Sequence, residues 1–338
     1  GYSPTGTHEL RLRGAGSHAL SGFNERPLPT LRVVSGTALL NFMNLIVQDS
    51  VLLSTGTSLV TAGGNFLTVR GRLETAAGSS MTPHGVALEG PATLANVNGT
   101  FAPNIVRVAG PGTGPGTVLR NAANIGYTNV EFYTSYALSD SLTVSGYVYA
   151  TGAGVILDWN GRKIRAPLGL NFDANASGRM VNATDSLIVG DGANATSALL
   201  WDSGTSGTVS AGTILIRGGS TTLSSFVGTG TNHVIYSDSG LALTARSSAL
   251  NGTVTFSRLT IRGQAQYSVV SNFNNVTVTD TLRVQSGTLV VNGATYNIDG
   301  AGEGVLYADP GAVLTSSGGS VNLYSPTGTS LVQAGATF

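Results

Sequence analysis

The sequence predicts an all-β protein built as a parallel β-solenoid, in which short strands stack turn upon turn. The first observation is composition, because 47 of the 338 residues are Gly and only 10% are charged. The second is a recurring interval of 22 residues between similar strand segments. The third is a shortage of the polar residues that fill exposed helix faces, since Glu, Gln and Lys together supply twelve residues.

Composition and charge also exclude several classes of protein. Seventeen basic residues balance seventeen acidic ones, whereas a nucleic-acid-binding protein usually carries a basic surplus. The chain has no Cys, which excludes a disulfide scaffold and a thiolate zinc site. The apolar fraction of 41% argues against long disordered tails. No run of about 18 apolar residues occurs, so we expect no transmembrane helix.

The 22-residue interval carries the fold prediction. It separates Leu45 from Leu67, Leu142 from Ile164 and Val276 from Ile298, and each interval contains short β-branched segments divided by turn residues. Alternating β-branched residues indicate strands, and Ser-Gly or Asn-Gly pairs indicate turns. A repeat of about 20–22 residues with two or three short strands is one turn of a parallel solenoid, here called a rung.

A longer and more diverged repeat divides the chain into three units, 1–100, 101–225 and 226–338. The middle unit is the longest and contains an apparent insertion near 171–208. An aromatic residue opens each unit, and Phe338 opens a fourth; the three unit-opening residues are Tyr2, Phe101 and Phe226. This repeat phase predicts either continuation in a longer chain or end-to-end self-association.

A tandem array of immunoglobulin-like sandwiches is the alternative fold. Units of about 100–125 residues with many short strands are also typical of such arrays. The equal 22-residue intervals favour the solenoid.

The carboxylates are too few and too scattered to predict a catalytic site. The densest set is Asp140, Asp158, Asp185 and Asp191. Asp140 and Asp185 precede Ser-Leu, as strand-entry residues do, and Asp191 lies in a Gly-Asp-Gly turn. A glycoside hydrolase or lyase needs several acidic side chains converging on one face. We therefore predict structural roles for these residues and no catalytic residue.

No cofactor-binding or metal-binding residue is predicted either. The four His residues, His8, His18, His84 and His233, form no HxH or HxxxH pair. The chain also lacks the nonapeptide and DxDxDG patterns of calcium sites. Trp159 and Trp201 each end an apolar segment, which favours a core position, with a sugar-stacking platform as the alternative.

The repeat motifs resemble a known group of proteins. Diverged Leu-Thr-Val-Ser-Gly-x-Leu and Gly-x-Leu-x-Val-Asn-Gly rungs, with no Cys and Lys163 as the single Lys, are similar to the repetitive β-solenoid regions of large secreted bacterial surface proteins. Filamentous-haemagglutinin-like adhesins and autotransporter passengers are examples. The resemblance implies an extracellular or cell-surface location and a non-enzymatic, elongated module.

The resulting hypothesis is a structural or adhesive stalk or filament module that contacts a surface glycan or a host receptor and does not bind nucleic acid. Two alternatives stay open. One is a carbohydrate-active β-helix enzyme or phage-tail depolymerase, and the other is a glycan-binding module that uses Trp159 or Trp201.

Overall fold

The computed structural model describes most of the chain, and the fold and surfaces below concern this part. The described residues are 8–21, 27–41, 44–89, 93–109, 123, 125–173, 175–190, 198–202, 208–217, 220–224, 226–237, 245–251, 254–263, 266–271, 275–292, 295–299, 305–323 and 331–332. The chain divides into two compact units, Gly1–Thr151 and Gly152–Phe338, and each is described by itself. The predicted repeat landmarks Tyr2 and Phe338 lie outside the described residues.

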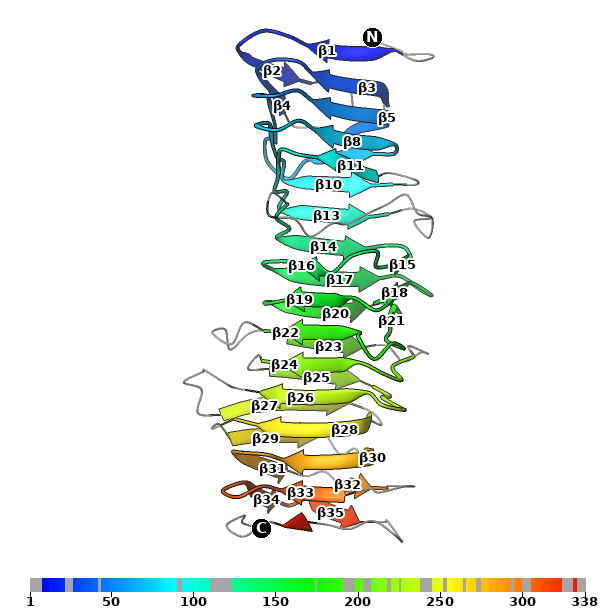
Figure 1. Cartoon of the computed structure of the whole chain (residues 1–338), viewed down its shortest axis with the longest axis vertical. Helices are drawn as coiled ribbons and strands as arrows, with labels where there is room; N and C mark the ends of the chain where they lie inside the picture. Colours follow the sequence, from blue (N-terminus) through cyan, green and yellow to red (C-terminus); the bar gives the residue numbers. More distant parts are fainter. Residues whose placement is uncertain are drawn as a thin grey trace. The chain divides into compact units, whose positions relative to one another are not determined.

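The first unit consists of short strands joined by turns (Figure 1). They are β1 (Glu9–Leu12), β2 (Ser17–Leu20), β3 (Leu28–Val33), β4 (Thr37–Leu40), β5 (Leu45–Leu53), β6 (Ser58–Thr61), β7 (Phe66–Val69), β8 (Arg72–Thr75), β9 (Ser80–Thr82), β10 (Gly85–Leu88), β11 (Thr93–Val97), β12 (Thr100–Phe101), β13 (Ile105–Val108), β14 (Asn129–Phe132), β15 (Tyr136–Ala137), β16 (Leu142–Thr143) and β17 (Tyr147–Thr151).

The second unit has the same construction. Its strands are β18 (Ile156–Asp158), β19 (Lys163–Ala166), β20 (Gly169–Asp173), β21 (Ser177–Arg179), β22 (Ser186–Val189), β23 (Ala198–Asp202), β24 (Thr213–Ile216), β25 (Ser220–Ser224), β26 (His233–Ser237), β27 (Ala245–Asn251), β28 (Val254–Arg262), β29 (Gln266–Ser271), β30 (Asn275–Val284), β31 (Thr288–Asn292), β32 (Thr295–Ile298), β33 (Val305–Ala308), β34 (Val313–Ser317), β35 (Ser320–Leu323) and β36 (Leu331–Val332).

Each strand pairs with the strand at the same position on the next rung. In the first unit, β3 lies between β1 and β5, and β10 lies between β7 and β13. A second sheet of that unit runs in the order β2, β4, β6, β9, β12. In the second unit, one sheet contains β22, β24, β26, β28 and β30 in succession, and another contains β23, β25, β27, β29 and β31.

These pairings are parallel, which confirms the predicted fold class. Immunoglobulin-like sandwiches are built from antiparallel strands, so the alternative fold is wrong. Leu45 lies opposite Leu67 as the interval predicts, but Val276 lies opposite Tyr296 rather than Ile298. The separation between paired residues varies, from 17 for Tyr127 and Val144 to 29 for Gly169 and Ala198, because the turns between strands differ in length.

The core consists of inward-facing rows in which each apolar side chain packs on its counterpart one rung away. One row in the first unit is completely buried, and its members are Leu45, Leu67, Val86, Val106, Val130 and Val148. A similar row in the second unit is nearly inaccessible, and its members are Ile164, Leu187, Ile214, Val234, Leu259, Leu282 and Leu306. Burying each such side chain contributes about 1.5–3 kcal/mol to folding.

Some corners of the solenoid require Gly because consecutive rungs approach closely there. A Cβ atom at Gly71 would lie 1.8 Å from the carbonyl oxygen of Asp49, one rung away. Gly212 has φ of +80°, and a Cβ atom there would lie 2.5 Å from the carbonyl oxygen of Asp185. At these corners the high Gly content has a direct steric reason.

We predict that Leu67→Ala lowers the free energy of unfolding by about 2–5 kcal/mol, because it leaves a cavity between Leu45 and Val86. Thr82→Ala is the control, because Thr82 is exposed on β9 and should change stability by less than about 0.5 kcal/mol. Urea titration followed by circular dichroism measures both. Equal effects of the two substitutions would contradict the assigned core.

Candidate functional site

The carboxylates that sequence analysis considered for catalysis have separate structural partners. Asp158 pairs with Arg179 on the neighbouring strand β21, and Asp140 accepts a hydrogen bond from the backbone N–H of Ser141. Asp191 lies outside the described residues. Asp140 belongs to the first unit and Asp158 to the second. The contacts just given are a structural role for each carboxylate within its own unit.

Asp185 is a buried carboxylate that closes a corner of the second unit. Its side chain is 1% exposed. Oδ1 accepts a hydrogen bond from the backbone N–H of Gly161 at 2.6 Å, and Oδ2 accepts from those of Val181 and Asn182, both at 2.8 Å. The residue directly precedes β22, which confirms the strand-entry role predicted for it.

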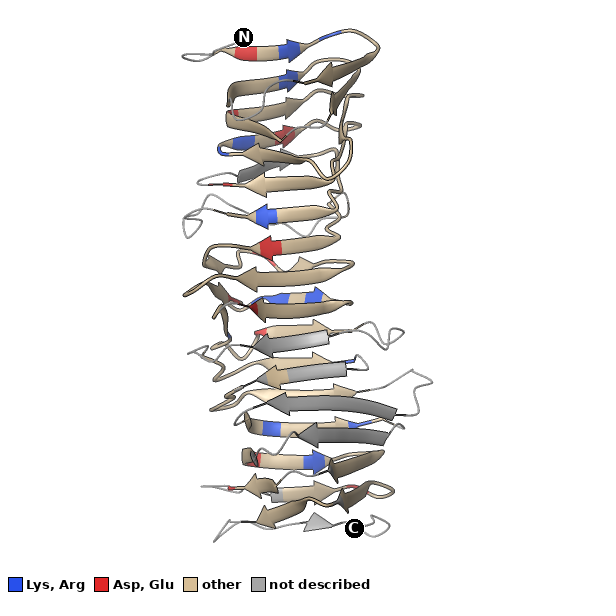
Figure 2. Ribbon diagram, turned by 180° about the vertical axis from the view of Figure 1, so that it is seen from behind, with Lys and Arg blue, Asp and Glu red and all other residues tan. Residues whose placement is uncertain are grey.

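Most other acidic side chains with a recorded ion pair bind Arg on a neighbouring rung. Arg70 contacts Glu89 at 2.9 Å, Arg107 contacts Glu131 at 2.6 Å and Arg283 contacts Asp309 at 2.6 Å. The pairs Arg32–Glu9, Arg179–Asp158 and Arg258–Asp280 have the same arrangement. Figure 2 shows two consecutive strands, β13 and β14, that carry opposite charges. Exposed pairs of this kind contribute about 0–1 kcal/mol each, so their clearest effect is on which residues face each other.

Trp159 is a core residue. Its side chain is completely buried, Nε1 donates to the carbonyl oxygen of Ser186 at 3.2 Å, and its ring lies 6.4 Å from that of Phe172. The alternative of a sugar-stacking platform at Trp159 is therefore wrong. The side chain of Trp201 lies outside the described residues.

Of the His residues that the structure describes, His8 directly precedes β1 and His18 lies on β2, whereas His84 directly precedes β10 and His233 begins β26 of the second unit. Within the described part of the chain, no group of three or more His, Asp or Glu side chains could hold a metal ion. His233 is the His with the most clearly perturbed environment, and it belongs to the surface described next.

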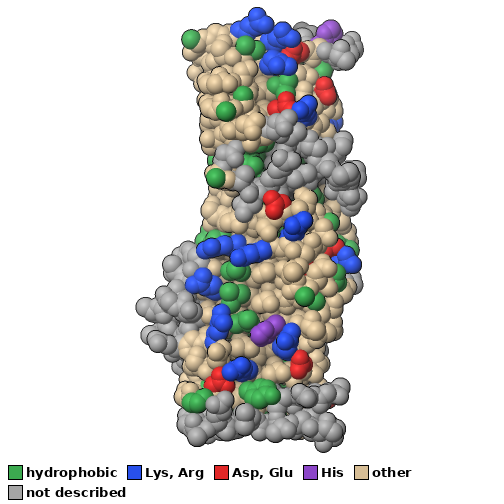
Figure 3. Space-filling view, in the orientation of Figure 1, with side chains coloured by type: hydrophobic (Ala, Val, Ile, Leu, Met, Phe, Trp, Pro, Cys, Tyr) green, Lys and Arg blue, Asp and Glu red, His purple; other side chains and the backbone are tan. Residues whose placement is uncertain are grey.

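One outer surface of the second unit is rich in cations, and we call it the basic face. It is formed by the outward side chains of β19, β22, β24, β26, β28 and β30 and of the residue that follows β24. Its cationic residues are Lys163, Arg165, Arg217, Arg258, Arg262 and Arg283. Figure 3 shows blue side chains gathered over this surface. The carboxylates that pair with its cations are Asp280, 3.8 Å from Arg258, and Asp309, 2.6 Å from Arg283.

The register of the strands explains why these residues share a surface. Lys163 lies in line with Ser186, Thr213, His233 and Arg258. The next outward row begins at Arg165 and ends at Arg283, and the half-buried residues Ile188, Leu215 and Ile235 lie between these two. Rungs are about 4.8 Å apart, so the basic face extends about 24 Å from β19 to β30.

His233 lies within the basic face and is uncharged near neutral pH. Its Nε2 is 2.8 Å from Oγ1 of Thr260. Burial is the main cause that lowers the pKa of His233, and the charges of Arg258 and Arg262 lower it further, while Asp280 raises it. The cationic character of this face at neutral pH therefore comes from its Arg and Lys residues.

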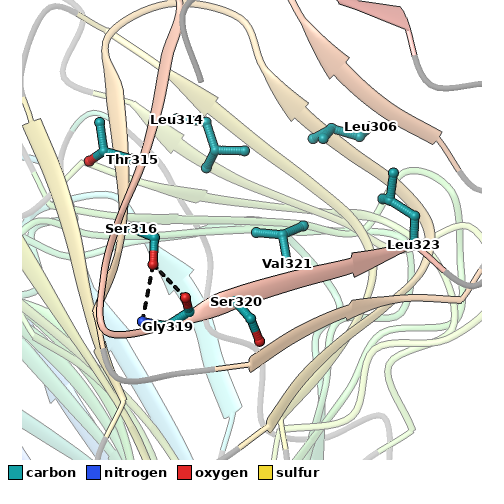
Figure 4. Close-up of a pocket in the computed structure, with 8 residues that line it drawn as sticks. All are labelled: Leu306, Leu314, Thr315, Ser316, Gly319, Ser320, Val321 and Leu323. Carbon is teal, nitrogen blue, oxygen red and sulfur yellow. Dashed lines mark hydrogen bonds between the residues drawn. The ribbon is translucent and has the colours of Figure 1, made fainter.

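A separate pocket of about 560 Å³ lies at the last described rungs of the second unit (Figure 4). Its large apolar lining residues are Leu306, Leu314, Val321 and Leu323. Ser316 and Gly319 form hydrogen bonds with each other across its edge. The pocket thus offers apolar contact and little chemistry that would select a ligand.

No family model, curated protein or solved structure matches the chain. Among the residues that the structure describes, none forms a helix long and apolar enough to cross a membrane.

Sequence reasoning did not find the basic face. Its cations are distant in the sequence, and the separation between paired residues ranges from 20 for Thr213 and His233 to 27 for Ser186 and Thr213. The local signal is two basic residues an even number of positions apart in one strand, two in Lys163–Ala166 and four in Val254–Arg262. That signal identifies residues that face outward, but it does not show which strands pair with each other.

We predict that Asp185→Ala lowers the free energy of unfolding by at least about 1–3 kcal/mol, because it removes the acceptor of three backbone N–H groups. Asp140→Ala is the comparison and should have a smaller effect, because Asp140 is only half-buried. Thermal or urea unfolding measures both variants. Unchanged stability of Asp185→Ala would refute the structural role of this carboxylate.

We also predict that His233 makes stability depend on pH. Because the pKa of His233 is lowered in the folded state, the unfolded chain binds more protons between that pKa and about 6.5, and stability rises with pH in this window. The stability that neutral His233 contributes to the folded state is fully present above about pH 6.5 and is lost as the pH falls through the folded-state pKa of His233. The urea concentration at the midpoint of unfolding, measured at several pH values, should rise less steeply with pH for His233→Gln than for the unsubstituted chain. Identical pH dependence of the two midpoints would contradict the prediction.

Proposed function

We propose that the chain is a non-enzymatic structural and adhesive module, of the stalk or filament kind, whose basic face binds an anionic polysaccharide. The observation that carries this proposal is the gathering of six cations and two paired carboxylates on one surface of a chain whose net charge is zero. A surface of one sign attracts a polymer of the other sign even where the whole protein is neutral.

The stalk or filament role is supported by how the rungs hold together. In a solenoid each repeat contacts its neighbours, so rungs can be added without changing the contacts within the stack. The resemblance of the repeat motifs to solenoid regions of secreted bacterial adhesins supports an extracellular or cell-surface location. End-to-end self-association, or continuation in a longer chain, belongs to the same proposal.

The non-enzymatic part is supported by the roles of the acidic side chains. Glu89, Glu131, Asp158 and Asp309 take part in ion pairs between neighbouring rungs. Asp185 is occupied by three backbone N–H groups. Hydrolysis or lyase chemistry on sugars needs carboxylates that can exchange protons with a substrate, and these are committed to structural partners.

A polysaccharide fits the basic face better than a nucleic acid does. Proteins that bind single strands interleave cations with aromatic rings on which bases stack. Here half-buried aliphatic side chains, Ile188, Leu215 and Ile235, lie between the cations. Such residues can contact the C–H groups of a sugar chain while Arg165 and Arg262 bind its carboxylate or sulfate groups.

The experiment is binding of the purified chain to heparin and to polygalacturonate as sulfated and carboxylated probes, with dextran as the neutral comparison. We expect affinity for the anionic polymers that falls with salt, and at least a tenfold loss in the variant Arg165→Gln, Arg217→Gln, Arg262→Gln, since each cation near an anionic surface contributes about 1 kcal/mol.

The matched control is the variant Arg11→Gln, Arg13→Gln, Arg72→Gln, which removes the same charge from the first unit and should retain binding. Equal affinity of the two triple variants would refute the assignment to the basic face. Tighter binding of duplex DNA than of either polysaccharide at the same salt concentration would refute the proposed partner.

A further inference from the structure

An outer groove of the first unit carries a second, independent inference. Its volume is about 470 Å³, within the range of small-molecule sites, and we call it the Tyr133 groove. It crosses strands β5, β7, β10 and β13 and reaches the residue after β14. The lining residues are Asn44, Ile46, Phe66, Thr68, Ala87, Glu89, Arg107, Ala109 and Tyr133.

One wall of the groove is fixed by close packing across three rungs. Gly85 lies opposite Phe66, and a Cβ atom there would lie 2.3 Å from the Phe66 ring, so the ring lies directly over the Gly85 backbone. The guanidinium of Arg107, on the following rung, lies 4.0 Å from the centroid of the same ring. Phe66 therefore cannot swing into the groove without losing both contacts.

Tyr133 supplies an aromatic surface that remains accessible. Its side chain is 45% exposed, and its hydroxyl donates to Oε2 of Glu131 at 3.3 Å. Arg107 donates from Nε to the same carboxylate oxygen at 2.6 Å. Burial and the charge of Glu131 raise the pKa of Tyr133, so its phenol remains a neutral hydrogen-bond donor. The ring is thus held in place while almost half of the side chain faces solvent.

The polar groups of the groove are balanced in charge. Among the described lining residues, the one cation, Arg107, is paired with Glu131, and the one carboxylate, Glu89, is paired with Arg70 at 2.9 Å. Asn44 accepts a hydrogen bond from the backbone N–H of Phe66 through Oδ1, which leaves its amide NH₂ group as the donor. A charged ligand gains no net attraction here, whereas a neutral ligand with many hydroxyl groups finds both acceptors and donors.

We propose that the Tyr133 groove binds a neutral saccharide, with the apolar face of one pyranose ring on Tyr133 and hydroxyl groups on Glu89 and Asn44. Aromatic rings with one polar end suit ligands of this kind, because the C–H face of the sugar covers the ring. The short side chains of Ala87 and Ala109 leave room beside Tyr133 for the ring. This inference goes beyond the proposed function, since it concerns a different unit and a ligand without charge.

The test is calorimetric titration of the purified chain with maltohexaose, cellohexaose and laminarihexaose. We expect at least one of these to bind with Kd below about 1 mM, with little dependence on salt. Tyr133→Ala should weaken that binding at least tenfold. Tyr133→Phe should keep it within about threefold, because the stacking ring remains, and Glu89→Gln should weaken it by losing a charged acceptor.

Tyr147→Ala is the matched control, because Tyr147 belongs to the same unit and is 47% exposed but does not line the groove. It should leave the affinity unchanged. The proposal is overturned if none of the three oligosaccharides binds, or if Tyr133→Ala and Tyr147→Ala have the same affinity. The triple variant of the basic face should bind the neutral oligosaccharide normally, so the two proposals can fail separately.

Discussion

The structure depends on one constraint: each strand pairs in register with the strand at the same position on the next rung. This pairing satisfies the backbone N–H and C=O groups and places like side chains above one another about 4.8 Å apart. Most inward positions are therefore apolar, as in the row from Leu45 to Val148. Outward positions form rows as well. The charge and polarity of each surface therefore depend on which side chains lie next to one another along these rows.

This constraint also explains how a chain with few charges uses them. Like charges at the same position on adjacent rungs would repel each other. Ion pairs between neighbouring rungs bring opposite charges together, as in Arg107–Glu131 and Arg283–Asp309. Arg11 and Arg32 do lie opposite each other, and both pair with Glu9. On the basic face, cations on adjacent rungs are offset between rows, as Arg258 and Arg283 are. Although the net charge of the chain is zero, cations outnumber carboxylates on the basic face of the second unit, whereas the groove of the first unit is balanced in charge.

The parts of the fold that repeat could be predicted from the sequence. Leu45 and Leu67 are paired because the intervening turns have the length that the 22-residue interval implies. Val276 pairs with Tyr296 instead of Ile298, because a shorter connection shifts the register by two residues and keeps the same side of the strand inward. Asp185 and Trp159 could be assigned to structural roles from their neighbours alone, since Asp185 directly precedes a strand and Trp159 ends an apolar segment.

The two surfaces could not be predicted in this way. The basic face requires knowing that Lys163 and Arg258 lie in one row, and the rungs between them differ in length. The groove requires knowing that Phe66 lies over Gly85, which is a contact between side chain and backbone across rungs. Both depend on register accumulated over several turns, where an error in one turn displaces everything after it.

The unequal lengths of the rungs have an evolutionary consequence. Strand pairing is kept whether the paired residues are 18 or 29 positions apart, so additional residues are absorbed at the corners and the stacked rows are left intact. Corners such as those near Gly71 and Gly212, where the backbones of consecutive rungs lie in close contact, have no room for inserted residues. New recognition loops can therefore arise at the open corners of this scaffold by insertion, independently of selection on its core.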